Sequence, residues 1–503
     1  MRHGSTAAGG FCALALAWVA LVVGSGACAA SPDVAQTPLQ AEAVHFWRAA
    51  AEADVDAAYA LIRDNHPGMV PELGDLAFRQ SVAAAYARAR AQAPAVASYE
   101  GYAATLAAFA DALGDKHIWS RPNFVTGRPA WAGILMSKRG DHWIVADEEA
   151  SPPAESVLGG ELISCDGRSP EDLARATLGT YRVDWSVGAQ QVQAAPWLLV
   201  DEHNPFTPRP TACVFDRGGR RAPVTLSWRG VRREALTPRI AAAVGAGAAG
   251  FGIRAVGDGY WISLQSLLDP AAPVVAEVAA KAADLRQARF VVLDLRGNSG
   301  GSSLFGDQIA TALLGPDYVK SVIGSSDDGD CDDVWRVSDG NLRQLQYYLD
   351  VMGPTHGPEF TKIFSKVMAD AKAARAQGRS FSGSITCANK TSAPAAARPA
   401  SQLKGKLILI TDNLCFSSCL VVTDHFRQLG ALHVGQTTDS NTHYSEVREE
   451  SLPSGLSKFS TLQAVSVSNP LRYGPFVPAL AYQGDIADTP ALERWVRDQL
   501  NSP

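Results

Sequence analysis

The sequence FVVLDLRGNSGG occupies residues 290–301 and joins an apolar run directly to a glycine-rich segment. Residues 290–295 are apolar at all but one position, a pattern typical of a strand buried on both faces of a parallel sheet. Glycines let backbone N–H groups come close to a ligand, and ligands bind beside the carboxyl ends of strands in open α/β sheets. We therefore expect residues 297–301 to belong to a functional site at the edge of a sheet.

A second stretch, LILITDNLCFSSCL at residues 407–420, repeats this order of strand, loop and helix. Around both stretches, apolar runs alternate with segments of helical spacing. The runs predict strands at 259–264, 290–295, 407–410 and 432–434, and the helical segments lie at 271–287, 304–314 and 420–429. Apolar strands that alternate with helices predict a mostly parallel sheet with helices on both faces.

Regions of different composition surround this core. Residues 38–121 are rich in Ala at helical spacing, whereas residues 131–233 contain short β-rich runs separated by Gly, Asp and Pro. Residues 316–401 are polar, which predicts an insertion with some helix that could act as a lid. The boundaries that we expect are 1–30 for a leader, 31–128 for a helical domain, 129–235 for a β-rich domain, and 250–503 for the core with its insertion 316–401.

The composition limits the class of protein. With 503 residues, of which 47% are hydrophobic and 19% charged, the chain can form more than one packed core. This excludes a disordered protein and a single small binding module. The formal net charge of -6 provides no general attraction for polyanions, so we expect no nucleic-acid partner.

The N-terminus has the pattern of a secretion signal. Arg2 precedes an apolar run at 11–23, and small residues follow it. The run is shorter than the ~20 residues needed to cross a bilayer, and no later segment is long and apolar enough, so we expect no transmembrane helix. We expect cleavage after Ala29 and an exported chain, periplasmic or secreted. Cleavage before Cys28 is the alternative and would leave a lipoprotein with a lipid anchor.

Removal of the leader leaves six cysteines, an even number that suits disulfides in an oxidising compartment. Neighbouring elements suggest the pairs Cys165–Cys213 and Cys331–Cys387, although sequence alone does not select the pairing. Cys415 and Cys419 are spaced so that a disulfide could bridge them, with free buried thiols as the alternative. The cysteines have no CxxC or His-rich spacing, and we expect no metal and no cofactor.

Two serines are candidates for a nucleophile. Residues 297–301 match the GxSxG pattern of a nucleophile elbow and resemble the GDSGG of trypsin-like peptidases, and either reading selects Ser299. Ser417 lies where a strand passes into a helix, and the first N–H groups of a helix lack partners within it. The alternative is that Ser417 or Ser418 only caps the helix.

Several motifs together resemble the tail-specific or C-terminal-processing serine peptidases and their tricorn-like relatives. The most specific match is VLDLRGNSGG at 292–301, which is completed by FSS at 416–418 and GQT at 435–437. In the helical region, LIRDNHP at 61–67 and LGDKH at 113–117 also match. The resemblance covers most of the mature chain.

This resemblance implies a multidomain α/β fold. Residues 159–167, GGELISCDG, look like part of a PDZ-like domain, which would be the β-rich region. The remaining parts would be an N-terminal helical domain and an ααβ-layered catalytic core with a mostly parallel sheet, as in crotonase-like and ClpP-like folds. A PDZ-like domain can bind an extended peptide at a sheet edge.

The resemblance also implies site residues. Ser417 would be the nucleophile, with its oxyanion held by the N–H of Ser418 and by the turn formed by Gly300 and Gly301. Many members activate the serine with a lysine further along the chain, but position 442 is Thr here, so the Ser–Lys dyad is absent.

A serine hydroxyl needs a base near pH 7, and the tricorn-like branch takes a histidine from a DxH stretch. That stretch is Asp115-Lys116-His117 here, so we expect His117 to be the base. His443 is the competitor, because it lies next to the position of the lost lysine, and His433 falls in an apparent buried strand. The alternative is that His117 has only a structural role at the end of a helix, where a positively charged ring interacts favourably with the helix dipole.

The branch also orients the histidine with a carboxylate and a second serine. Lys116 stands where that serine is expected, and the Glu expected near residues 472–474 is missing. We take Glu446 as the substitute carboxylate. The function expected is an exported serine endopeptidase that cleaves peptides or unfolded proteins through an acyl-enzyme. The alternatives are a peptide- or ligand-binding protein that has lost its catalytic relay, and a small-ester hydrolase that uses Ser299.

Overall fold

The structure is a computed structural model that describes residues 38–124, 127–149, 156–245, 249–324, 333–386, 399–468 and 471–501. Contacts divide the chain into residues 1–42 and residues 43–503, and the site described below lies within the second unit. The predicted leader, residues 1–30, lies outside the described residues. Within the described ranges, no helix combines the length and the apolar character needed to span a membrane.

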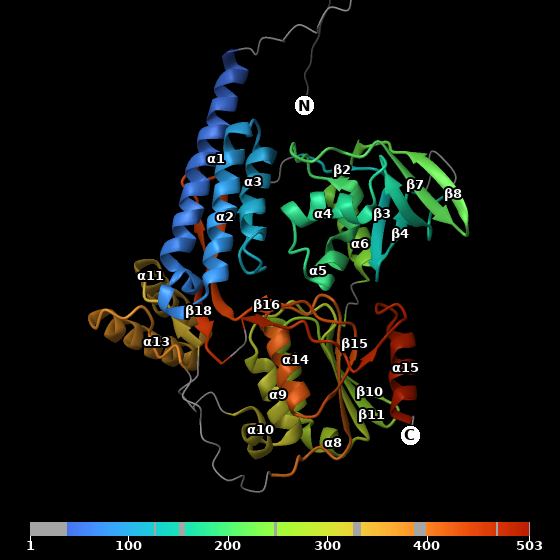
Figure 1. The fold of residues 1–503 in the computed structure, drawn as a ribbon. Helices are drawn as coiled ribbons and strands as arrows, with labels where there is room; N and C mark the ends of the chain where they lie inside the picture. Colours follow the sequence, from blue (N-terminus) through green and yellow to red (C-terminus); the bar gives the residue numbers. More distant parts are fainter. Residues whose placement is uncertain are drawn as a thin grey trace, which may run out of the picture. The chain divides into compact units, whose positions relative to one another are not determined.

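A six-stranded sheet with the order β10-β11-β12-β14-β15-β20 lies at the centre of the C-terminal region (Figure 1). β10 is antiparallel to β11, and every other pair is parallel. Four of these strands coincide with the strands predicted from the apolar runs. The bounds are β10 Phe251–Val256, β11 Gly259–Leu264, β12 Phe290–Asp294, β14 Lys406–Thr411, β15 Leu432–Gly435 and β20 Leu480–Ala481.

Helices cover both faces of this sheet because successive residues of a strand point to opposite sides. Val291 and Leu293 of β12 belong to a core with helices α7, α9 and α14, whereas Val292 belongs to a core with α15. The predicted helix 271–287 is two helices that meet at Lys281. The helices are α7 Ala272–Ala280, α8 Ala282–Gln287, α9 Leu304–Leu314, α14 Ser418–Gln428 and α15 Thr489–Asn501.

The β-rich region contains a five-stranded antiparallel sheet with the order β3-β4-β5-β7-β8. A disulfide joins Cys165 of β5 to Cys213 of β7, as predicted, whereas Cys331 and Cys387 lie outside the described residues. The small sheet β6-β2-β9 lies in the same region. The elements are β2 Ala130–Trp131, β3 Ile134–Arg139, β4 His142–Glu148, β5 Glu161–Cys165, α4 Pro170–Tyr181, α5 Gly188–Ala194, β6 Val200–Asp201, β7 Ala212–Arg217, β8 Arg220–Thr225, β9 Arg229–Gly230 and α6 Arg233–Val244.

The N-terminal helices α1 (Pro38–Asn65), α2 (Leu76–Gln92) and α3 (Tyr99–Asp111) share their core with strands from near the end of the chain. Phe459, Leu462 and Val465 of β18 (Ser457–Ser466) are fully buried in this core. β17 (Tyr444–Ser451) and β1 (Ser120–Pro122) both pair with β18. The helical region therefore packs against a part of the chain that the sequence assigned to the catalytic core.

The insertion contributes a strand to this same sheet. β13 pairs with β18, and Trp335 of β13 is buried among residues of α11 and α13. The sequence suggested that the insertion could act as a lid. In the structure, these contacts make its described residues a packed part of the fold. The elements are α10 Pro316–Ile323, β13 Asp333–Trp335, α11 Asp339–Tyr347, α12 Gly353–His356 and α13 Pro358–Ala376, and the remaining short strands are β16 Asn441–Thr442 and β19 Arg472–Tyr473.

Candidate active site

His117 is held at the end of the helical region by contacts with a distant strand. The segment 112–119 follows α3 and leads into β1. The Oγ of Ser460, in β18, donates a hydrogen bond to the carbonyl oxygen of His117 at 2.8 Å and accepts one from the N–H of Trp119 at 2.7 Å. These contacts tie the DxH segment to the C-terminal half of the chain.

Ser417 lies at the turn between β14 and α14. It immediately precedes the first residue of the helix and has φ 57° and ψ -130°, a left-handed backbone conformation that residues with a side chain rarely adopt. The turn is fixed by hydrogen bonds from the N–H of Leu420 to the carbonyl oxygen of Ser417, at 2.8 Å, and from Cys419 to Phe416, at 3.1 Å. Strained backbone of this kind is concentrated at functional sites.

The two side chains meet. The Nε2 of His117 lies 3.0 Å from the Oγ of Ser417. His117 is 8% exposed, and its ring packs against Phe416 with centroids 4.5 Å apart. A histidine within hydrogen-bond distance of a serine hydroxyl can take its proton, which is the geometry required to activate a serine nucleophile.

A carboxylate orients the histidine from the other side. The Oδ1 of Asp115 lies 2.9 Å from the Nδ1 of His117 and accepts the backbone N–H of the same residue at 2.8 Å. Because an ionised carboxylate only accepts hydrogen bonds, the proton of the neutral ring belongs on Nδ1, and Nε2 faces Ser417 as an acceptor. The other oxygen, Oδ2, accepts a hydrogen bond from the Oγ1 of Thr442.

The environment of Asp115 keeps it ionised. Burial alone would raise its pKa, but the nearby charge of His117 and the hydrogen bonds from His117 and Thr442 outweigh burial and lower the pKa of Asp115 to about 2. Asp115 is therefore a carboxylate throughout the neutral pH range and can stabilise a positive charge on the imidazole ring.

Glu446 does not take the role that the sequence suggested for it. Its neighbours are Asp333 and Tyr348, and burial together with the charge of Asp333 raises the pKa of Glu446 to about 7. The carboxylate at His117 is instead Asp115, which belongs to the DxH motif but was given no role. The spacing of two residues was a usable signal, because an Asp can accept the N–H of the second residue after it in an Asx turn.

The structure also accounts for the two positions that depart from the family pattern. Thr442, at the position of the lost lysine, is the residue that donates to Asp115. Lys116, at the position of the expected serine, directs its ammonium group toward the buried Asp439, with Nζ and Oδ2 2.7 Å apart. Neither contact was predicted from the sequence, because each joins residues that are more than 300 positions apart.

The glycine turn packs directly against Ser417. A Cβ on Gly300 would lie 2.8 Å from the Cβ of Ser417, and the Oγ of Ser418 donates to the carbonyl oxygen of Gly301 at 2.7 Å. The N–H of Gly300 donates to Oδ1 of Asn298 at 2.9 Å, which corrects its predicted role as an oxyanion donor. Of the predicted donors, Gly301 and Ser418 have N–H groups without a hydrogen bond to any described residue.

The other candidates lie in different surroundings. His433 is buried in β15 with its Nε2 2.8 Å from the Oγ1 of Thr411, and burial lowers the pKa of His433 to about 4. The ring of His443 packs against Tyr444, with centroids 4.5 Å apart. Ser299 is exposed, and among the described residues no hydrogen bond joins its side chain to a histidine.

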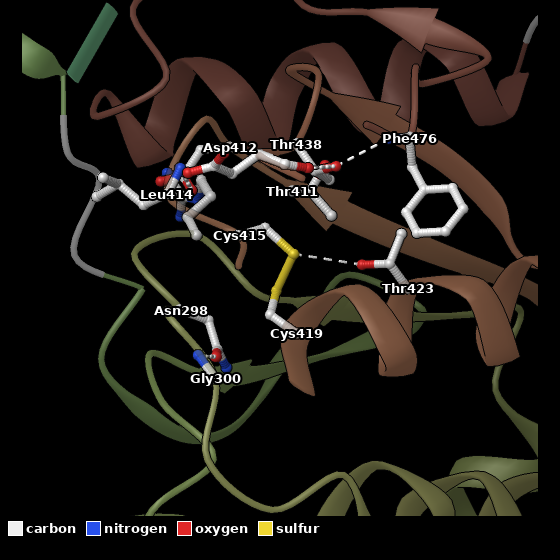
Figure 2. Close-up of a disulfide and its surroundings, with 12 residues drawn as sticks. Asn298, Gly300, Thr411, Asp412, Leu414, Cys415, Cys419, Thr423, Thr438 and Phe476 are labelled. Carbon is white, nitrogen blue, oxygen red and sulfur yellow. Dashed lines mark hydrogen bonds between the residues drawn. A yellow bond between two sulfur atoms is a disulfide. The ribbon is translucent and has the colours of Figure 1, made fainter. Parts of the chain in front are cut away.

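A disulfide encloses the serine turn. Cys415 and Cys419 are bonded on either side of Ser417, with Cα atoms 5.3 Å apart. Figure 2 shows this bond, the contact of 3.4 Å between the Sγ of Cys415 and the Oγ1 of Thr423, and the side chain of Asn298 beside Gly300. Both cysteines are fully buried. Across the described ranges, no group of three or more His, Cys, Asp and Glu residues is arranged to hold a metal ion.

The chain is similar to known proteins both in sequence and in fold. Residues 261–464 match the sequence model of peptidase family S41. The fold is similar to that of mature CPAF, with 14% sequence identity, a TM-score of 0.55, and coverage of 91% of this chain and 98% of that one. A serine-to-alanine mutant of CPAF gives 14% identity and a TM-score of 0.56 over the same shares. No curated protein matches the chain.

At this level of identity, the likeness to CPAF shows a shared fold. The match to the peptidase family includes β12, β14 and β15 of the central sheet, both loops of the candidate site and most of β18. The chain is a serine-type peptidase, a hydrolase that resembles peptidase family S41.

Proposed function

We propose that this chain is an exported endopeptidase that cleaves peptides or unfolded proteins through an acyl-enzyme on Ser417. The observation that carries the proposal is the 3.0 Å contact between the Nε2 of His117 and the Oγ of Ser417, with Asp115 on the other ring nitrogen. A serine, a histidine and an aspartate in this order form the same set of roles that serves acyl transfer on several unrelated folds.

In the proposed reaction, Nε2 of His117 takes the proton of Ser417 as Oγ attacks the carbonyl carbon of the scissile bond. The N–H groups of Gly301 and Ser418 are the candidate donors to the oxyanion that forms. His117 then gives its proton to the leaving amine, and the C–N bond breaks. A water molecule, deprotonated by the same ring, attacks the acyl carbon and releases the acid and Ser417.

The β-rich region supports a substrate that is an extended polypeptide. Its five antiparallel strands end at the exposed strand β8, and a sheet edge can bind a peptide by adding it as a further strand. Its resemblance to a PDZ-like domain motivates this part of the proposal. A peptide that retains a free C-terminus is the form that such a domain would select.

Export is supported by the cysteines. The bonds Cys165–Cys213 and Cys415–Cys419 require an oxidising compartment to persist, which agrees with a periplasmic or secreted chain. Cleavage after Ala29 would release the chain, and cleavage before Cys28 would anchor it to lipid. The mass of the N-terminal peptide of the mature chain distinguishes these two cleavage sites.

The test is hydrolysis of a denatured, fluorescently labelled protein by the wild type and three variants. We expect Ser417→Ala and His117→Ala to lose activity, by about 10³-fold or more, with unchanged unfolding midpoints. Ser299→Ala is the matched control and should cleave like the wild type. Internal cleavage products identify an endopeptidase. Full activity in Ser417→Ala together with loss in Ser299→Ala would assign the nucleophile to Ser299. Hydrolysis of small acyl esters without cleavage of the protein would favour the ester-hydrolase alternative, and binding without cleavage would favour the binding protein.

A further inference from the structure

Asp439 is a fully buried carboxylate close to the DxH segment and the serine loop. Its Oδ2 accepts hydrogen bonds from Nζ of Lys116 at 2.7 Å and from Nε2 of Gln193 at 3.1 Å. Its Oδ1 accepts from Nε2 of Gln190 at 3.0 Å and from the N–H of Ser440 at 2.8 Å. A carboxylate without exposure to water costs much free energy unless it is paired and hydrogen-bonded, and here both oxygens have two donors.

Hydrogen bonds join Asp439 to three separate parts of the chain. Lys116 immediately precedes His117, and Gln190 and Gln193 belong to α5 of the β-rich region. The third part is the serine loop, which is joined through the backbone. The N–H of Asp439 donates to the carbonyl oxygen of Cys415 at 3.1 Å, and Nε2 of Gln193 donates to that of Asn413 at 2.6 Å.

Lys116 also contacts Phe416, the residue that precedes Ser417. Its Nζ lies 4.8 Å from the centre of the Phe416 ring, and that ring packs against the imidazole of His117. A displacement of Lys116 would therefore reach His117 through the chain and through Phe416. Small displacements matter, because a shift of about 1 Å from productive geometry can cost about 10²-fold in rate.

We propose that Asp439 is a positioning residue that fixes the DxH segment, the serine loop and helix α5 relative to one another, so that His117 and Ser417 keep their contact. This inference rests on the proposed function. It assigns a role to the lysine that replaces the expected serine: Lys116 is the cationic partner of Asp439 and stands outside the His117–Asp115 relay.

The test uses the kinetics of labelling by a fluorophosphonate probe, which separate the binding of the probe from its reaction with serine. Asp439→Asn keeps the volume of the side chain and removes the charge. We expect its maximal labelling rate to fall about tenfold or more, with the concentration for half-maximal rate within about twofold of the wild type. Glu277→Gln is the matched control, because it breaks an exposed Lys–Glu pair on α7 and should leave both values unchanged.

Two further experiments keep the test decisive if Asp439→Asn fails to fold. Gln193→Met keeps a similar length but removes the amide that donates to Asp439 and Asn413 and accepts from Nζ of Lys116. We expect a smaller loss in the same rate. The pair Lys116→Met and Asp439→Leu forms a double-mutant cycle. We expect the double variant to lose less than the sum of the single losses, because it leaves no unpaired charge.

The outcomes separate this inference from the proposed function. If the wild type is labelled on Ser417 and a folded Asp439→Asn or Gln193→Met reacts at the wild-type rate, the role of Asp439 is wrong and the proposed nucleophile stands. If the wild type is not labelled on Ser417, the proposed function fails first. A lower labelling rate with an unchanged unfolding midpoint supports positioning, whereas a lower midpoint with an unchanged rate supports a structural role only.

Discussion

The Nε2 of His117 and the Oγ of Ser417 lie 3.0 Å apart although 300 positions separate them in the sequence. The fold achieves this by pairing β1 with β18, which brings the end of the helical region to the second half of the chain. Ser460 of β18 then fixes the backbone on both sides of Ile118. The contact therefore depends on strands whose pairing no local pattern reveals.

Replacement of Asp115 tests the orientation of the base. In Asp115→Asn the side chain keeps its shape, but its amide can stabilise the wrong tautomer of His117 and provides no negative charge. We expect the turnover number to fall by about 10³- to 10⁴-fold with little change in KM. Glu446→Gln is the control, and steady-state peptide hydrolysis is the measurement. A greater loss in Glu446→Gln than in Asp115→Asn would restore the carboxylate predicted from the sequence.

Replacement of Thr442, which donates a hydrogen bond to Asp115, should lower the turnover number less than replacement of Asp115 does. Thr442→Val removes the hydroxyl that donates to Oδ2 and keeps the branched shape. Because a single hydrogen bond to a charged group is lost, we expect the turnover number to fall by about tenfold. Thr442→Ser retains the donor and should restore most of the rate. Equal rates in the Val and Ser variants would show that this hydrogen bond does not contribute to catalysis.

The close approach of Gly300 to Ser417 predicts that no side chain is tolerated there. Gly300 has φ 108°, and an added Cβ would meet the Cβ of Ser417 at 2.8 Å. We expect Gly300→Ala to reduce fluorophosphonate labelling by about 10²-fold. Gly430→Ala is the matched control, because Gly430 also has positive φ but nothing lies within 4 Å of its added Cβ. Equal labelling of the two variants would mean that backbone strain, rather than contact with the serine, causes any loss.

The two disulfides should differ in what they stabilise. Loop closure predicts a contribution to stability of about 4 kcal/mol for Cys165–Cys213 and about 2 kcal/mol for Cys415–Cys419, because the first closes a much longer loop. We expect the double substitution of Cys415 and Cys419 by Ala to lower activity more and the unfolding midpoint less than the same substitution of the other pair. Activity and midpoint measured on both variants decide this, and the reverse order would contradict it.

Because Asp412 is buried, we expect the stability of the protein to depend on pH. Burial raises its pKa to about 7, above the value of about 3.9 in an unfolded chain. Between these values the native state binds more protons than the unfolded state, so this group's stabilisation is complete below about pH 4 and is lost as the pH rises to about 7. Urea unfolding of the wild type should show this decline, and Asp412→Asn should show a smaller one. Equal pH dependence in both proteins would exclude Asp412 as its source.

Much of the central sheet could be predicted because its signals are local. The runs at 259–264, 290–295, 407–410 and 432–434 are apolar enough to identify buried strands, and the structure places strands there. The break at Lys281 was not predicted, because the helical spacing continues across it. The packing of β18 against the N-terminal helices was also missed, since it depends on contacts between distant parts of the chain.

In the candidate site, too, local motifs could be predicted from the sequence, whereas tertiary contacts could not. Ser417 and His117 could be named from their motifs, and the structure places them in contact. Asp115 stood within the motif, but the sequence drew attention to Glu446, whose burial and surroundings no pattern revealed. The N–H of Gly300 was assigned to the oxyanion because the acceptor Asn298 is visible only in the folded turn. Local motifs thus identified Ser417 and His117, and tertiary contacts supplied the partners of these two residues.

Peptide mapping after reaction with a fluorophosphonate identifies which serine is the nucleophile. Digestion and mass spectrometry of the labelled full-length chain locate the modified residue. We expect a single adduct on Ser417, formed rapidly by the wild type and slowly by His117→Ala. An adduct on Ser299, or an equal labelling rate in the wild type and His117→Ala, would contradict it.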